Sequence, residues 1–276
     1  MPAVNPAPPV KYVRPNHRSG RLLLFGFLKA RFAGWRWFER RRQDCASEAG
    51  RRTMAVLILT IGMGLGFSRI AQCQPIDLSH QAIGALPEEF AFWRAGRIDL
   101  GHWAVVGDSA SPGGAAIQRW DKDRSVQAAL AVYAPLSALN AAIRTRFKLI
   151  DGSTPSAGVA LRVIGPDDYY LVRASGYEQR VSLLHVVRGT AEEIAGVDAD
   201  VSKEHWQTLD VLVRDSEFTI SLDDRWVLTA FDRKSLTVGQ FGIWTERDDV
   251  TRFDRIEITP LTNSLEPSDW RARFGG

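Results

Sequence analysis

Apolar and polar residues alternate along much of the second half of the chain, and this period of two is the pattern of half-buried β-strands. In one such run Leu209, Val211 and Val213 form the apolar side. Five runs follow one another between residues 206 and 259, separated by short breaks that carry the Asp, Ser and Gly of tight turns. The pattern predicts a β-meander over this region.

Strand-like runs extend back to residue 103. The strand candidates cover residues 103–106, 115–120, 128–133, 141–150, 158–164, 169–174, 180–187, 206–214, 218–222, 226–231, 240–244 and 252–258. No stretch between them has room for a long amphipathic helix with apolar residues every three or four positions. So many strands are typical of two packed sheets rather than of a small barrel. We therefore predict that residues 87–260 form an all-β, two-sheet jelly-roll sandwich.

The formal net charge of +3 over 276 residues hides an uneven distribution. Residues 1–53 hold 12 Lys and Arg against 3 Asp and Glu, whereas the rest of the chain holds 23 against 29. Phosphate binding depends on a local surplus of Lys and Arg, which the folded part lacks. Nucleic acid is therefore not an expected partner.

A short apolar run at 55–67 follows two arginines and precedes small residues. It is shorter than the about 20 residues that a membrane-spanning helix needs, and its flanks suit cleavage after Cys73. We predict a signal peptide at 54–73 and an exported domain, periplasmic or extracellular, that meets a membrane only through its leader before cleavage. Two alternatives stay open, a membrane anchor through residues 54–70 and lipid attachment at Cys73.

The remaining segments have simpler interpretations. Residues 1–53 form a basic leader, either untranslated because synthesis starts near Met54 or a disordered arm. Residues 74–86 are interpreted as a linker and 261–276 as a C-terminal tail. Both cysteines of the chain precede residue 74, so the exported domain would be stabilised by its core alone.

Several segments resemble exported bacterial domains of the concanavalin A-like lectin/glucanase superfamily, near laminin-G-like and 3-keto-disaccharide hydrolase-like domains. These segments are GHWAVV at 101–106, RFK at 146–148, AGVALR at 157–162, DYYLVRA at 168–174 and FGIWTERDDVTRFD at 241–254. The resemblance spans about residues 87–258 and implies a jelly roll of two curved sheets. It implies little about activity. The loops at 175–179 and 246–249 depart from the expected forms, which leaves the ligand specificity near them open.

Catalytic residues are not recognisable. A retaining glycosidase needs two carboxylates about 5 to 5.5 Å apart, and no strand candidate carries inward acids at alternate positions. No nucleophile elbow is present. Enzyme activity stays an open question, with a glycoside hydrolase or lyase as the class if there is one. No cofactor is expected; paired Asp residues in loops fit turn formation, and no specific motif supports calcium.

Two strands offer candidate ligand-binding side chains. In the run 143–149, one side is apolar and faces the core, which leaves Arg144 and Arg146 on the other face. Trp244, in the run 240–244, is a candidate platform for a sugar ring, although tryptophan in such a strand is more often part of the core.

A third set depends on a hairpin. If the turn at 165–168 pairs Ile164 with Tyr169, then Arg162, Tyr169 and Arg173 share one face. The opposite face is then apolar and consists of Val159, Leu161, Val163, Tyr170 and Val172. Arginine forks and aromatic rings suit the hydroxyl and carboxylate groups of sugars. We hypothesise that this face is concave and binds a sugar or acidic glycan; the alternative is a solvated face whose arginines pair with Asp and Glu of the same sheet.

The predicted function is carbohydrate association, with a glycan or glycoside as the partner. Two alternatives belong to other classes, a keto-glycoside hydrolase or lyase and a non-catalytic interaction module of the cell envelope. Fold alone does not choose among them.

Overall fold

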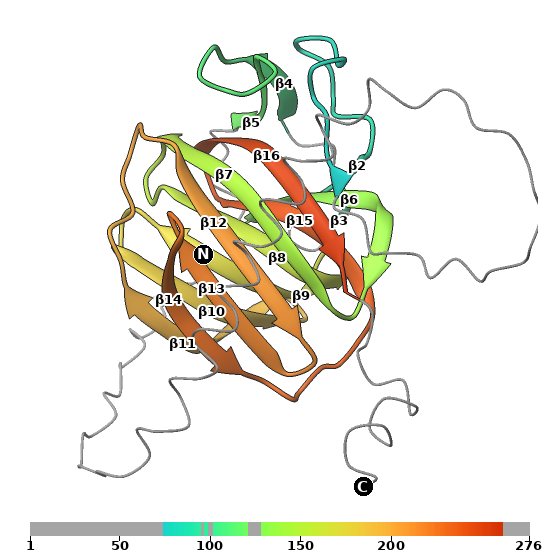
Figure 1. The fold of residues 1–276 in the computed structure, drawn as a ribbon, viewed down its shortest axis with the longest axis vertical. Helices are drawn as coiled ribbons and strands as arrows, with labels where there is room; N and C mark the ends of the chain where they lie inside the picture. Colours follow the sequence, from blue (N-terminus) through green and yellow to red (C-terminus); the bar gives the residue numbers. More distant parts are fainter. Residues whose placement is uncertain (1–73, 95–96, 99–101, 121–127, 262–276) are drawn as a thin grey trace, which may run out of the picture.

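The computed structural model describes residues 74–94, 97–98, 102–120 and 128–261 (Figure 1). The predicted leader, signal peptide and the tail beyond residue 261 lie outside the described residues. Within the described ranges, no helix has the length and hydropathy needed to cross a membrane.

The fold is an all-β, two-sheet jelly-roll sandwich, as predicted. Sheet A contains β1 (Gln74–Pro75), β4 (Trp103–Gly107), β5 (Ala115–Trp120), β7 (Ala141–Asp151), β12 (Gln207–Arg214), β13 (Glu217–Leu222), β14 (Arg225–Phe231) and β16 (Val250–Pro260). Sheet B contains β2 (Phe90–Arg94), β3 (Arg97–Ile98), β6 (Ala128–Ala138), β8 (Ser156–Gly165), β9 (Asp168–Ser175), β10 (Arg180–Val187), β11 (Thr190–Asp198) and β15 (Gly239–Glu246).

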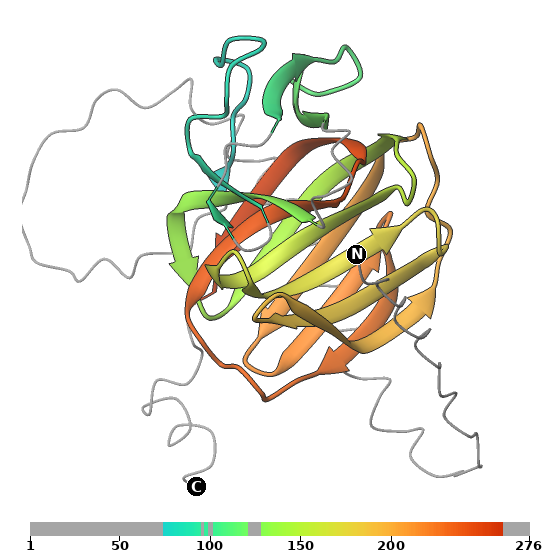
Figure 2. The ribbon, with the colours of Figure 1, turned by 180° about the vertical axis from the view of Figure 1, so that it is seen from behind.

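The two sheets lie face to face, with sheet A toward the viewer in Figure 1 and sheet B toward the viewer in Figure 2. The spatial order is β14-β13-β12-β7-β16-β5-β4 in sheet A, with β1 beside β16, and β11-β10-β9-β8-β15-β6-β2-β3 in sheet B. All strand pairs within the two sheets are antiparallel.

The core lies between the sheets and is formed by alternate residues of the facing strands. Phe147 and Val211 of sheet A and Leu161 of sheet B are fully buried in it. Burial of a side chain of this size stabilises the fold by about 1.5 to 3 kcal/mol. The apolar faces predicted from the period of two are therefore confirmed at Phe147, Leu161 and Val211.

The predicted five-stranded meander is only partly correct. Strands β12, β13 and β14 are consecutive neighbours, but β15 crosses to sheet B between β8 and β6, and β16 returns to sheet A between β7 and β5. Strand β15 carries apolar side chains on both faces, because Phe241 and Ile243 enter the core whereas Trp244 joins a second apolar cluster on the outer face. Alternation along one strand does not say which strand lies beside it.

Four strands, β1, β2, β3 and β11, were absent from the predicted set. The edge strand β11 carries mostly exposed and charged residues, which hide its strand character and protect the edge from pairing. Strands β2 and β3 precede residue 103, where the predicted strands begin. Within the predicted linker 74–86, β1 pairs with β16, and Ile76 and Leu78 are buried in the core, so this part of the segment belongs to the packed domain.

The β8–β9 hairpin contains a bulge that changes the predicted faces. Gly165 pairs with Asp168 but Leu161 pairs with Tyr170, so residues 162–164 of β8 together oppose Tyr169 alone. The predicted Ile164–Tyr169 pair is therefore wrong. Arg162 has a φ of 50°, and this left-handed residue reverses the alternation of the strand.

Because of the bulge, Arg162 points between the sheets and Val163 points outward into the second apolar cluster. The predictions that Arg162 points outward and that Val163 lies in the core are therefore wrong. The backbone of β15 fits closely against the bulge, since a Cβ at Gly239 would lie 2.4 Å from the carbonyl carbon of Arg162.

Candidate functional site

The six side chains proposed from the sequence lie in three separate places. Arg144 and Arg146 lie on the outer face of sheet A, and Arg162 lies between the sheets. Tyr169, Arg173 and Trp244 lie on the outer face of sheet B, and only these three are brought together.

On sheet A, the two arginines are held by carboxylates of the same sheet. Arg144 forms ion pairs of 2.8 Å with Asp210 and 3.0 Å with Asp224. Arg146 donates two hydrogen bonds of 2.7 and 2.6 Å to Asp254, and its guanidinium lies 4.7 Å from the Trp206 ring centroid. The N–H groups of both arginines are thus directed at carboxylates of sheet A. These contacts stabilise the sheet rather than present donors to a ligand.

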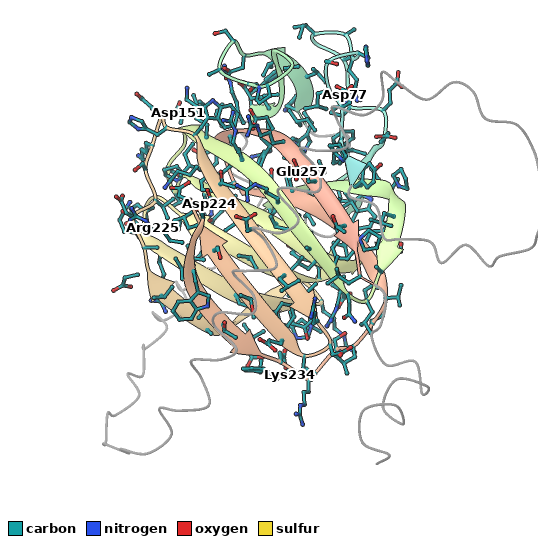
Figure 3. The ribbon with its side chains drawn as sticks, in the orientation of Figure 1. Asp77, Asp151, Asp224, Arg225, Lys234 and Glu257 are labelled. Atoms are coloured by element: carbon teal, nitrogen blue, oxygen red, sulfur yellow. The ribbon has the colours of Figure 1, made fainter. Side chains whose placement is uncertain are left out.

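Arg144 stays positively charged beside these carboxylates. Burial opposes the charge, but the carboxylates of Asp210 and Asp224 raise the pKa of Arg144 above its ordinary value. Asp224 lies at the turn between β13 and β14 on this side of the molecule (Figure 3).

Arg162 connects three loops at one end of the sandwich. Its Nε donates to the carbonyl of Leu139 (2.9 Å), Nη1 to that of Ser235 (3.1 Å) and Nη2 to that of Asp215 (2.5 Å). The guanidinium also lies 5.5 Å from the Phe218 ring centroid. Burial lowers the pKa of Arg162. Arg162 therefore stabilises the contact between these three loops, and its side chain is too buried to bind a ligand.

On sheet B, charged side chains gather at one part of the outer face. Arg173 donates to Glu178 (2.5 Å), and its Nη1 lies 3.6 Å from Glu246 Oε2. On the next strand, Arg180 forms ion pairs of 2.8 Å with Glu193 and 3.1 Å with Asp198. We call these six residues the Arg173 cluster.

The two halves of the Arg173 cluster are connected through adjacent strands. Arg173 is the backbone partner of Ser182, and the Ser182 hydroxyl donates to Glu193 (3.0 Å). Arg173 also contributes to the electrostatic environment of Glu193, whose pKa lies below its ordinary value because Arg180, Ser182 and Arg173 together outweigh the effect of burial. The cluster is thus one continuous polar surface.

Glu246 is the most enclosed carboxylate of the Arg173 cluster. Burial raises its pKa, and the charge of Arg173 opposes this rise. Ser156 Oγ donates to it (3.3 Å). The Arg173 Nε is buried and has no hydrogen-bond acceptor among the described residues. A buried N–H group without an acceptor is unfavourable.

Sequence reasoning missed Glu178 and Glu246 as partners of Arg173. They lie in or beside the loops at 175–179 and 246–249, the two loops that depart from the family resemblance. The structure brings both loops to Arg173 because β8 lies between β9 and β15 in sheet B. The departures from the family pattern were the available signal, but the strand order was needed to connect them.

Trp244 and Tyr169 lie beside the Arg173 cluster on the outer face of sheet B. Gly158 is the partner of both Trp244 and Arg173, and a Cβ at Gly158 would lie 3.3 Å from Trp244 Cε3, so glycine lets the indole lie close to β8. Burial raises the pKa of Tyr169 to about 12. Trp244 is 5% and Tyr169 6% exposed, so they form an apolar border rather than open stacking faces.

A buried carboxyl group lies behind the cluster, in the turn between β15 and β16. Asp249 Oδ2 accepts a hydrogen bond from the Ser156 backbone N–H (2.9 Å), whereas Oδ1 has no partner among the described residues. Burial raises the pKa of Asp249 to about 7, with further contributions from Glu246 and Asp248. Asp249 is fully buried and is not accessible to a ligand.

No metal centre is evident in the described part of the chain, since no group of three or more His, Cys, Asp or Glu side chains there is arranged to hold an ion.

No protein-family model matches the chain, and no curated protein matches it. Among solved structures, the chain is similar to the carbohydrate-binding module CBM66 from Bacillus subtilis, with 18% identity and a TM-score of 0.50 over 62% of this chain and 97% of the module. This similarity shows a shared fold.

Two other similar structures have lower scores. One is a Bacillus subtilis protein of unknown function with a galectin-like fold, at 10% identity and a TM-score of 0.43, covering 62% of this chain and 89% of that one. The other is domain 4 of AbnA, an extracellular GH43 arabinanase from Geobacillus stearothermophilus, in complex with arabinotriose, at 11% identity and a TM-score of 0.44, covering 63% and 84%.

Proposed function

We propose that residues 74–261 form a carbohydrate-binding domain whose ligand contacts the Arg173 cluster on the outer face of sheet B. The observation that carries this proposal is the placement of Arg173 between Glu178 and Glu246, beside the apolar border formed by Trp244. The shared fold with a carbohydrate-binding module supports the same class.

The chemistry of the cluster matches the needs of a sugar ring. Each hydroxyl group both donates and accepts hydrogen bonds, and the cluster presents guanidinium donors next to carboxylate acceptors. Charge-assisted hydrogen bonds of this kind fix the orientation of a polar ligand.

We also propose that the domain acts outside the cytoplasm, on the basis of the apolar run at 55–67 and the cleavage pattern that follows it. This part of the proposal concerns residues outside the described ranges and is independent of the binding site.

A keto-glycoside hydrolase is the second candidate, and the observation in its favour is the raised pKa of Glu246, a property that general acids share. Against it, Glu178 and Glu246 both pair with the same arginine, which favours a binding role for the two carboxylates.

The test is binding of the full chain to a panel of oligosaccharides, with wild type compared with Arg173→Ala and Glu246→Gln. We expect each substitution to weaken binding at least about tenfold, because a hydrogen bond to a charged group contributes about 1.5 to 3 kcal/mol. Arg225→Ala is the matched control, since Arg225 is an exposed arginine on the edge strand β14 of sheet A.

Unchanged affinity in both site variants, with the fold retained, would contradict the proposed site. Release of free sugar from a 3-keto-disaccharide, abolished by Glu246→Gln, would instead assign hydrolysis to the same surface.

A further inference from the structure

The Arg173 cluster carries more negative than positive charge. Its two arginines, Arg173 and Arg180, face four carboxylates, those of Glu178, Glu193, Asp198 and Glu246. Each guanidinium is already shared between two of these carboxylates. The exposed Arg247 adds one further positive charge beside Glu246, and the surface keeps a net negative charge with it included.

Three of the four carboxylates are more accessible than either arginine of the cluster. The Glu178, Glu193 and Asp198 side chains are 41%, 39% and 93% exposed, compared with 16% for Arg173 and 31% for Arg180, whereas Glu246 is 21% exposed. An approaching ligand thus meets hydrogen-bond acceptors with negative charge before it meets the guanidinium of Arg173. Hydroxyl groups donate to such acceptors, whereas a ligand carboxylate or sulfate is repelled.

The ion pair between Arg180 and Glu193 packs directly against the backbone of β11. A Cβ at Gly196 would lie 2.5 Å from Arg180 Nη2 and 2.7 Å from Glu193 Oε1, so the pair rests directly on this glycine. The Ser182 hydroxyl holds Glu193 from a third side. Reorientation of Arg180 toward an acidic ligand would break these contacts.

We propose that the ligand of the Arg173 cluster is an uncharged glycan, and that the four carboxylates exclude uronic acids, sialic acids and sulfated sugars. This inference rests on the proposed function, and it replaces the sequence-based hypothesis that acidic glycans are among the ligands.

The experiment compares binding of the full chain to neutral polysaccharides (laminarin, arabinan and galactan) and to acidic ones (polygalacturonate, alginate and heparin). For wild type, we expect binding to at least one neutral polymer and at least about tenfold weaker binding to every acidic one, because like charges brought together at an interface are strongly unfavourable. The double variant Glu178→Gln/Glu193→Gln should bind the acidic polymers more tightly than wild type does.

The matched control is Glu192→Gln. Glu192 precedes Glu193 on the same strand but pairs with exposed Lys234 on the other face, so its substitution removes the same charge at a different place. We expect this variant to keep the selectivity of wild type.

The outcomes separate the two proposals. Preference for acidic polymers that is lost in Arg173→Ala would overturn the uncharged ligand while leaving the binding site intact. Absence of binding to every polymer, or binding that is insensitive to Arg173→Ala, would overturn the proposed function and this inference with it. Equal selectivity of the double variant and wild type would show that the carboxylates do not exclude acidic sugars.

Discussion

Replacement of Arg162 by alanine is expected to destabilise the domain by about 3 to 5 kcal/mol, because it leaves three backbone carbonyl oxygens without the buried charged group that donates hydrogen bonds to them. The side chain donates to the carbonyl oxygens of Leu139, Asp215 and Ser235, which lie in three different loops. Without it, these acceptors lose their common donor at the end of the sandwich. Urea unfolding of the full chain, followed by intrinsic tryptophan fluorescence, measures the change.

Two further variants separate this contact from a general loss of packing. Arg162→Lys keeps the charge but cannot reach three carbonyls in the planar geometry of a guanidinium, so it should recover only part of the loss. Gly239→Ala should also destabilise, since its Cβ would meet the Arg162 backbone, whereas Gly107→Ala, where no atom lies within 4 Å, should not. A change below about 1 kcal/mol in Arg162→Ala would contradict the structural role.

The stability of the domain is expected to fall as the pH rises from about 4 to about 7, and Asp249→Asn should remove most of this fall. Burial raises the pKa of Asp249 from its ordinary value of 3.8 to about 7. Between these values the folded state keeps the proton that the unfolded state has lost, so folding is favoured at the lower pH. Above about 7 both states are ionised, and the contribution no longer changes with pH.

Asparagine carries no charge to bury. The variant should therefore be more stable than wild type at pH 8, by an amount on the order of 2 to 4 kcal/mol, and similar to it at pH 4. Melting temperatures measured across this pH range test the effect. Asp151→Asn is the matched control, because Asp151 is an exposed carboxylate at the nearby end of β7 (Figure 3). Parallel pH profiles for wild type and Asp249→Asn would show that Asp249 is not the group responsible.

The sequence predicted most strands and the identity of the core because both depend on local alternation. Phe147, Leu161 and Val211 each lie at an apolar position of a period-two run, and each is fully buried. The alternation of apolar and polar residues was weakest in the strands at the edges of the sheets. Strand β11 buries little and carries Glu192 and Glu193, so its burial pattern differs from that of the central strands.

The candidate site depended on features that local alternation does not contain. A bulge of two extra residues in β8 turned Arg162 inward, and nothing in a run of six alternating residues signals such a change of register. Arg173 was placed on the correct face, but its partners Glu178 and Glu246 come from two distant loops. Their meeting follows only from the strand order of sheet B.

The most direct test of the central claim is an NMR titration of the isotopically labelled full chain with a neutral oligosaccharide that it binds. Binding at the Arg173 cluster predicts that amide shifts change around Arg173, Glu178, Glu193 and Glu246, while those around Arg144 and Arg146 on sheet A stay constant. Shift changes confined to sheet A would contradict the account.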